Sequence, residues 1–417
     1  MTKTSDSIVE TVHTPPRRAL LGSRPAKMLL IGLAKRYVTD PFEIRDEHND
    51  AVFTSGTGPC PTLTILDKRA WSMVLTGGSA GLGEAYIRNW WTTNDLTGVL
   101  RALLRALART EAQRTGVHRF FAPLTERVRK LRSADKARDR RNIIAHYDIG
   151  NEFFKLLLDP TLMYSSGYFS TPDVSMEEAS NAKNDRLCRS LGLRAGHRLM
   201  EIGTGWGGFA MHAASKFGVH VTTTTISNEQ FDYATERVNR AGLSEQITVL
   251  NEDYRDLSGT FDRLVSIEMI EAVDWREHET YFAKCETLLK PDGVMGLQAI
   301  TINDDRYERA KATNDFIKSF IFPGGCLPSY ESIVRSTSAA TSLKVQSADR
   351  FGSSYVTTLQ RWRDSMNRNT SAITALGLDD SFIRLWDFYL SYCETGFAEK
   401  SIDVQQILLA RTGYVHS

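Results

Sequence analysis

The chain has 417 residues, of which 41% are hydrophobic and 24% charged, and 51 basic residues nearly balance 50 acidic ones. This length fits at least two domains, and the near-neutral charge excludes a general attraction to nucleic acid. The five cysteines are odd in number and form no Cys-x-x-Cys pair, which argues against a disulfide framework or a structural zinc site. We therefore expect a cytoplasmic protein without a metal.

The N-terminal third of the chain predicts a tail, a small domain and a linker. Residues 1–15 are polar and are expected to be disordered, and residues 16–125 mix strand-like runs with helical signals typical of a small α+β domain. Residues 126–142 carry eight basic residues against three acidic ones and are expected to be a basic linker. The apolar patch at 28–33 is far shorter than the ~20 residues of a membrane-spanning helix, so we predict no transmembrane segment or signal peptide.

Residues 143–417 are expected to form a doubly wound α/β domain. Short apolar strands alternate there with amphipathic helices, which is the pattern of a largely parallel sheet. The predicted strands are 197–202, 220–225, 247–250, 263–267, 294–300 and 404–409, with the main helices at 229–241 and 276–289. Pro291-Asp-Gly predicts a turn ahead of the fifth strand.

A glycine-rich segment, Glu201-Ile-Gly-Thr-Gly-Trp-Gly-Gly208, follows the first predicted strand and leads into a helix-forming run. Glycines let the backbone turn tightly and approach a ligand at the carboxyl end of a strand. Dinucleotide sites share this pattern, but they place an acidic residue at the end of the second strand to hold the ribose. Here residues 223–227 are Thr-Thr-Thr-Ile-Ser, and the acid is Glu201, before Gly203. This arrangement favours S-adenosylmethionine over a nicotinamide cofactor.

Seven segments of the chain carry motifs, at 145–154, 159–166, 201–208, 225–230, 253–257, 320–329 and 389–393. In this order they resemble the motifs of the cyclopropane fatty acid synthase family, and the resemblance covers roughly residues 80–411. The resemblance implies a Rossmann-like class I methyltransferase sheet with a helical insert, plus a small N-terminal domain. It also implies methyl transfer from S-adenosylmethionine to the cis double bond of an unsaturated acyl chain in a phospholipid, forming a cyclopropane.

The resemblance also implies a set of cofactor-binding residues. Gln230 matches a residue that binds the ribose, and Asp253 and Tyr254 match residues near the adenine. The full set of expected cofactor contacts is Tyr164, Ser165, Glu201, Gly203, Gly205, Thr225, Gln230, Asp253 and Tyr254.

Four residues are the catalytic candidates. Glu271 and Tyr355 match residues that in the family help to hold a bicarbonate ion thought to take the proton. The chain departs from the family pattern at Ser166 in place of Cys, at Gln298 in place of His, and at Ala272 in place of another His. Ser and Gln can still donate hydrogen bonds to an anion, so we expect an altered anion site and leave bicarbonate binding open.

These departures leave three outcomes open. Besides cyclopropanation, residues 266–273 with Gln298 also resemble relatives that make a 10-methylene chain, which a separate reductase would convert to a 10-methyl branch. A catalytically inactive lipid-binding relative is the third outcome. A small-molecule methyltransferase would need neither the N-terminal domain nor the linker at 126–142.

The basic linker suggests how the substrate is reached. Each Lys or Arg near an anionic bilayer can add ~1 kcal/mol, so we expect the linker to contact anionic lipid at the inner membrane face. A nucleic-acid role is not expected, because the run lacks interleaved aromatic residues. A homodimer is left open.

Overall fold

The computed structural model describes residues 22–112 and 149–413, so the predicted tail at 1–15 and linker at 126–142 lie outside the described residues. The chain forms two compact units. Unit 1 comprises Met1–Ser133, Ala312–Pro323 and Thr370–Glu399, and unit 2 comprises Ala134–Lys311, Gly324–Asn369 and Lys400–Ser417.

Unit 1 contains a four-stranded sheet and a group of helices that are distant in the sequence. The strand order is β2-β1-β3-β4, in which β1 runs parallel to β3 and antiparallel to β2. Its elements are α2 (Ser23–Tyr37), β1 (Phe42–Arg45), β2 (Ala51–Ser55), β3 (Thr62–Ile65), α3 (Arg69–Ile87), β4 (Trp91–Thr93), α4 (Leu96–Ala112), the π-helix η4 (Ile317–Ile321), α16 (Thr370–Ala375) and α17 (Asp380–Ala398).

Unit 1 is not one continuous segment that ends at a linker. It also includes helix α17, near the C-terminus, which packs against α3 and α4. The Tyr86 hydroxyl donates to Asp387 Oδ2 at 2.8 Å, and Arg101 Nε donates to Glu399 Oε1 at 2.6 Å. The Phe388 ring of α17 also lies 5.7 Å from that of Tyr86. The apolar faces of α3 and α4 are therefore buried by a helix that follows them by about three hundred residues.

Unit 2 contains the predicted α/β fold, and the six predicted strands occur in the predicted order, but the strand at Leu343–Arg350 was not predicted. Its elements are α8 (Asn151–Leu157), α9 (Met176–Ser190), β5 (Arg198–Ile202), α10 (Gly208–Phe217), β6 (His220–Thr224), α11 (Asn228–Arg240), β7 (Ile247–Leu250), η1 (Tyr254–Asp256), β8 (Phe261–Ile267), η2 (Ile270–Ala272), η3 (Trp275–Glu277), α12 (His278–Thr287), β9 (Leu289–Ile302), α13 (Asp304–Ala312), α14 (Tyr330–Ala340), β10 (Leu343–Arg350), α15 (Gly352–Arg368) and β11 (Ile402–Arg411).

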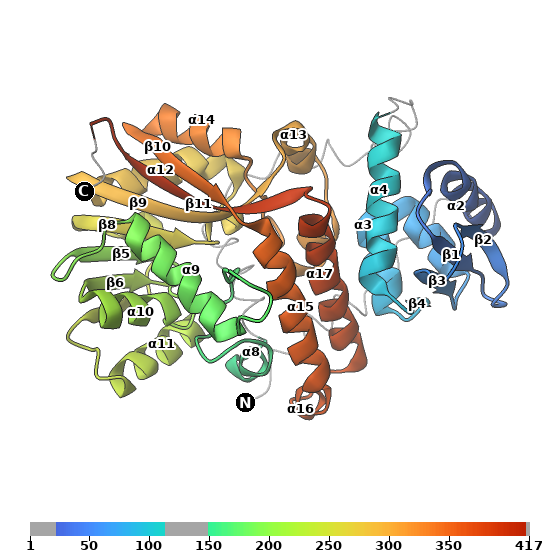
Figure 1. The fold of residues 1–417 in the computed structure, drawn as a ribbon, viewed down its shortest axis with the longest axis horizontal. Helices are drawn as coiled ribbons and strands as arrows, with labels where there is room; N and C mark the ends of the chain where they lie inside the picture. The colour runs from blue at the N-terminus through green and yellow to red at the C-terminus, as the bar shows by residue number, and fades with distance from the viewer. Residues whose placement is uncertain (1–21, 113–148, 414–417) are drawn as a thin grey trace. The chain divides into compact units, whose positions relative to one another are not determined.

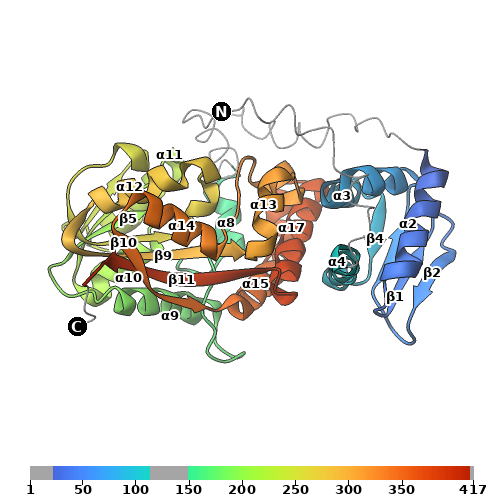
Figure 2. The ribbon, with the colours of Figure 1, turned by 90° about the horizontal axis from the view of Figure 1, so that it is seen from above.

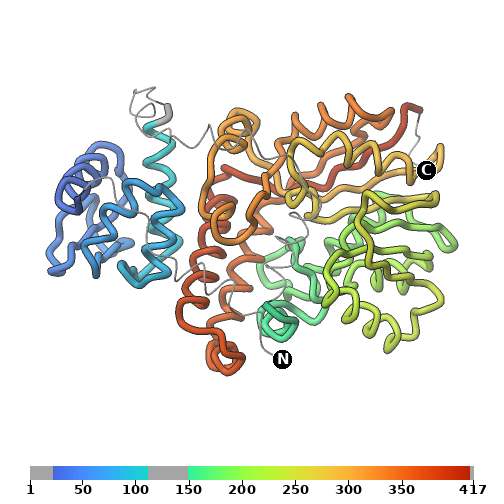
Figure 3. Tube along the Cα trace, turned by 180° about the vertical axis from the view of Figure 1, so that it is seen from behind, coloured from blue at the N-terminus to red at the C-terminus, as the bar shows by residue number. Residues whose placement is uncertain are grey.

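The seven strands of unit 2 have the order β10-β11-β9-β8-β5-β6-β7, and β11 runs antiparallel to both of its neighbours (Figure 1). The C-terminal strand β11, red in Figure 3, thus lies between β10 and β9. The prediction of a turn at Pro291 is wrong, because Pro291 lies within β9, which begins at Leu289. The pairing of β9 with β8 shifts register there, which accommodates the additional residues.

Helices cover both faces of this sheet, as a doubly wound fold requires. Figure 2 shows α12 and α14 on one face and α9 and α10 on the other. Each face has its own buried cluster, one including Phe282 and Ile333, the other Leu187 and Phe209. Because both faces are covered, ligands must approach at the strand ends, where the polar candidates lie. Within residues 22–112 and 149–413, no helix is long and apolar enough to span a bilayer.

Gly83 of α3 provides a test of the packing in unit 1. A methyl group added at this position would lie 2.2 Å from Phe316 Cδ2 and 3.0 Å from Phe388 Cε1. We expect Gly83→Ala to destabilise the protein, because overpacking costs ~1–3 kcal/mol and the gain in helix propensity is only ~1 kcal/mol. Urea unfolding measures the difference.

Gly32→Ala in α2 is the matched control, because no atom lies within 4 Å of the added methyl group. This variant should be neutral or more stable by up to ~1 kcal/mol. Equal stability of the two variants would contradict the packing described for α3.

Candidate functional site

The glycine-rich loop links β5 to α10 in unit 2. Gly203, Gly205 and Gly207 have φ angles of 106°, 51° and 83°, a region that side-chain-bearing residues rarely adopt. The amides of Gly203 and Thr204 both donate to Thr224 O, at 3.0 and 2.9 Å, which ties the loop to β6. A methyl group added at Gly205 would meet no atom within 4 Å, so the loop leaves room for a ligand.

The carboxyl group of Glu201 stabilises this loop. Its Oε2 accepts a hydrogen bond from Thr223 Oγ1 at 2.6 Å, and that hydroxyl lies 2.7 Å from Thr204 Oγ1. Burial raises the pKa of Glu201 to about 8, although the hydrogen bond from Thr223 opposes the shift. The carboxyl group therefore holds the loop in place through the hydroxyl groups of Thr223 and Thr204.

The segment before the sheet brings Tyr164 and Ser165 to the same unit. Ser165 is buried, and its Oγ accepts a hydrogen bond from Lys183 Nζ at 3.0 Å. The ring of Tyr164 lies 5.3 Å from that of Phe154 and 5.3 Å from that of Trp362. Both predicted cofactor contacts are thus held by neighbours on other elements.

The remaining cofactor candidates follow β6 and β7. Thr225 Oγ1 donates to Gln230 Oε1 at 2.9 Å, which fixes the side chain of Gln230 in the first turn of α11. Asp253 accepts two hydrogen bonds at 2.8 Å from the side chain of Arg255. Tyr254 packs edge-on against Tyr281 at 5.4 Å. All these residues lie at the carboxyl edge of the parallel strands.

A half-buried carboxyl group, that of Glu268, brings three of the four catalytic candidates together. Its Oε1 accepts hydrogen bonds from the amide of Ser166 at 3.0 Å and from Gln298 Nε2 at 2.7 Å. Its Oε2 accepts a hydrogen bond from the Tyr355 hydroxyl at 2.7 Å. The Ser166 contact uses the backbone amide, because the Ser166 hydroxyl donates to Gly167 O.

The side chain of Gln298 is oriented from its other end. Gln298 Oε1 accepts a hydrogen bond from Gln406 Nε2 at 3.0 Å, and Gln406 Nε2 also contacts Lys183 O at 3.1 Å. Gln298 and Gln406 face each other across β9 and β11. This pairing leaves the amide nitrogen of Gln298 directed at Glu268.

Glu271, the fourth catalytic candidate, is not joined to the other three by the hydrogen bonds around Glu268. Its Oε1 accepts a hydrogen bond from the amide of Ile300 at 2.5 Å, and its Oε2 is buried and has no partner among the described residues. Burial, reinforced by the nearby charge of Glu268, raises the pKa of Glu271 to about 8. Glu271 is therefore predominantly neutral at pH 7.

The site does not fit a bicarbonate ion as the resemblance implied. The Ser166 hydroxyl, expected to donate to that ion, donates instead to Gly167 O, and the amide group of Gln298 and the hydroxyl of Tyr355 both donate to Glu268. An added anion at this place would also compete with the carboxyl group of Glu268 for these hydrogen bonds.

Aromatic rings line the same region. Trp362 is buried, and its ring lies 5.3 Å from Tyr164 and 6.2 Å, edge-on, from Tyr355. Such rings can stabilise a nearby cation through their faces. Sequence reasoning missed Trp362, Glu268 and Lys183. For Glu268 the usable signal was its place directly after a strand, only three residues before Glu271.

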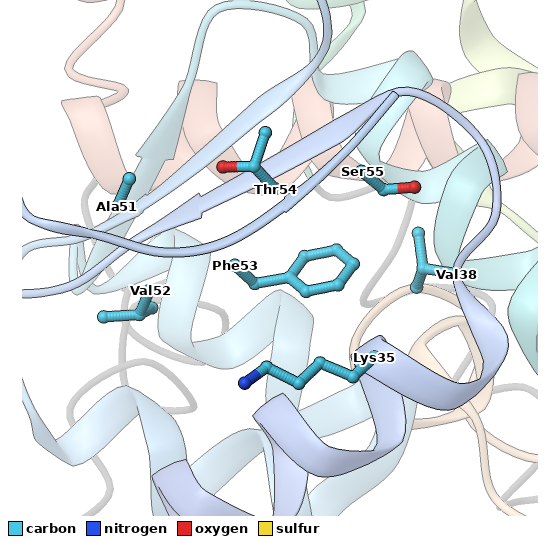
Figure 4. Close-up of a pocket in the computed structure, with 7 residues that line it drawn as sticks. All are labelled: Lys35, Val38, Ala51, Val52, Phe53, Thr54 and Ser55. Carbon is cyan, nitrogen blue, oxygen red and sulfur yellow. The ribbon is translucent and has the colours of Figure 1, made fainter. Parts of the chain in front are cut away.

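A surface hollow in unit 1 offers no comparable chemistry. It lies beside the edge strand β2, where Phe53 points toward Val38 and Lys35 (Figure 4). None of the predicted site residues lines it.

Three comparisons with known proteins agree with this geometry. A family model for mycolic acid cyclopropane synthetase matches residues 134–407. The chain is 37% identical over 345 residues to tuberculostearic acid methyltransferase UfaA1 of Mycobacterium tuberculosis, covering 81% of this chain and 80% of the relative. It is 35% identical over 360 residues to cyclopropane-fatty-acyl-phospholipid synthase of Escherichia coli, covering 86% and 89%.

One solved structure with a similar fold contains bound ligands. The crystal structure of mycolic acid cyclopropane synthase CmaA1 complexed with SAH and CTAB has a TM-score of 0.61 and 31% identity, covering 65% of this chain and 97% of that one. SAH is the demethylated form of S-adenosylmethionine, so the predicted fold class and cofactor are both confirmed. The chain belongs to the cyclopropane synthase family of S-adenosylmethionine-dependent methyltransferases.

Proposed function

We propose that the protein transfers the methyl group of S-adenosylmethionine to the cis double bond of an unsaturated acyl chain carried by a phospholipid. The observation that carries this proposal is the buried polar cluster around Glu268, which lies next to the glycine-rich loop. A side chain at Gly203 would come within 3.5 Å of Met269, the neighbour of Glu268. This short distance supports the proposal that the cofactor loop and the cluster form one site.

The residues of this site suit a reaction through a carbocation. An alkene is a weak nucleophile, and S-adenosylmethionine supplies the electrophilic methyl group when it is bound. Trp362 and Tyr355 are buried and exclude water, and their ring faces favour a positive charge nearby. Glu268 adds a carboxylate within the same cluster.

The proposal that a phospholipid acyl chain is the acceptor is based on the names of the relatives. One of them is named as a synthase of cyclopropane fatty acyl phospholipids. In this proposal the enzyme docks on the inner membrane face through the basic linker at 126–142, outside the described residues.

The product is proposed to be the cyclopropane, with a methylene-bearing chain as the second candidate. The second candidate is favoured by one observation, the altered anion position, where Glu268 accepts hydrogen bonds from Gln298 and Ser166. A relative named for tuberculostearic acid, a methyl-branched acid, supports it as well. A separate reductase would follow in that case.

A vesicle assay tests the proposed function. We expect incubation with labelled S-adenosylmethionine and vesicles of oleoyl phospholipid to add one CH2 to the acyl chain, detected by mass spectrometry of the fatty esters. A product that resists mild hydrogenation is the cyclopropane, and one that takes up hydrogen is the methylene. If no unsaturated lipid accepts a methyl group, the proposed function is wrong.

Gly203→Ala tests the cofactor loop. Position 203 has a φ of 106°, so alanine must either strain the loop or change its shape. With a cost of roughly 1–2 kcal/mol for a left-handed residue, we expect the Kd for S-adenosylmethionine to rise about tenfold or more. Isothermal titration calorimetry measures the Kd.

Gly196→Ala is the matched control, since Gly196 also has a positive φ, 83°, but precedes β5 at the other end of the strand. It should leave the Kd unchanged. Similar losses in both variants would mean that backbone strain alone, rather than the loop's approach to the cofactor, explains the result.

A further inference from the structure

The cluster around Glu268 contains its own anion. Three donors from three separate segments, Ser166, Gln298 and Tyr355, converge on its two carboxylate oxygens at 2.7 to 3.0 Å. These are positions at which the family resemblance placed contacts to an added ion. We propose that the Glu268 carboxylate itself accepts the proton that the methylated acyl chain loses, an inference that rests on the proposed function.

The backbone supports a specific role for this residue. Glu268 directly follows β8 and has a φ of 51°, a left-handed conformation that is costly for a residue with a side chain. Its amide donates to Gln298 O at 2.8 Å, which holds this conformation. Glycine would fit this backbone conformation better, so the glutamate side chain has a cost in stability.

The charges around Glu268 favour its ionised form over that of Glu271. Burial raises the pKa of Glu268, but hydrogen bonds from Tyr355, Gln298 and Ser166 and the charge of Lys183 oppose the rise. Glu271 receives hydrogen bonds from the backbone of Ile300 and from its own backbone, and the nearby charge of Glu268 raises its pKa further. Two nearby carboxyl groups with unequal environments divide the roles, and Glu268 is the base.

The proposed step balances in atoms and charge. The π electrons of the alkene form the bond to the methyl carbon while the carbon–sulfur bond breaks, which leaves a carbocation on the acyl chain. Glu268 then takes one proton, and the electrons of the broken C–H bond close the cyclopropane ring. After a hydride shift the same proton loss forms the methylene double bond instead. Glu268 ends the step as a neutral carboxylic acid in either case.

Two substitutions of Glu268 test this assignment on the full-length protein with S-adenosylmethionine and oleoyl vesicles. Glu268→Gln keeps the shape but cannot take a proton, so we expect kcat to fall by about 10²–10⁴-fold while cofactor binding is retained. Glu268→Gly removes the backbone strain of the positive φ. It also removes the carboxylate and leaves its position open to an added anion. Added sodium bicarbonate or formate should restore its turnover by about tenfold or more.

Glu271→Gln is the matched control, because it changes another buried carboxyl three residues away. It should lose less activity than Glu268→Gln and should not respond to added anions. The pH profile gives an independent result. Wild-type kcat should fall as the pH drops through the raised pKa of Glu268, and Glu268→Gln should lack this acidic limb.

The outcomes are distinct. If wild type methylates lipid and Glu268→Gln keeps the wild-type kcat, Glu268 is not the base. The assignment is also wrong if Glu268→Gly binds the cofactor but no anion restores its turnover. If wild type itself methylates no unsaturated lipid, the proposed function fails instead.

Discussion

The half-buried carboxyl group of Glu268 organises the carboxyl edge of the sheet in unit 2. Glu268 accepts hydrogen bonds from Ser166, Gln298 and Tyr355, which come from a loop, a strand and a helix. An unpaired buried carboxylate would be protonated or would destabilise the fold. The hydrogen-bond partners of Glu268 therefore join the segment before the sheet, strand β9 and helix α15 in one place.

The parallel sheet makes this convergence possible. Strands β5, β8 and β9 are neighbours, so the glycine-rich loop, Glu268 and Gln298 lie at or near adjacent strand ends. The antiparallel strand β11 then places Gln406 opposite Gln298 and fixes the direction of its amide. In place of the family's histidine, this neutral amide donates a hydrogen bond whose strength does not depend on protonation.

Much of unit 2 could be predicted from the sequence, because hydrophobic alternation and glycine positions are local signals. Glu201 to Gly208 and the strands at 247–250 and 263–267 are examples. The central role of Glu268 was missed because motif matching pointed to Glu271, and the hydrogen bonds to Ser166, Gln298 and Tyr355 join residues far apart in the sequence. The place of α17 in unit 1 depends on contacts between residues about three hundred positions apart, which leave no local pattern.

The ionisation state of Glu268 tests the account most directly. Infrared difference spectra between the wild type and Glu268→Gln at neutral pH report whether the lost group was ionised. We expect the substitution of Glu268 to remove a carboxylate stretching band, and Glu271→Gln to remove the carbonyl band of a protonated acid instead. A protonated-acid band lost on substitution of Glu268 would contradict it.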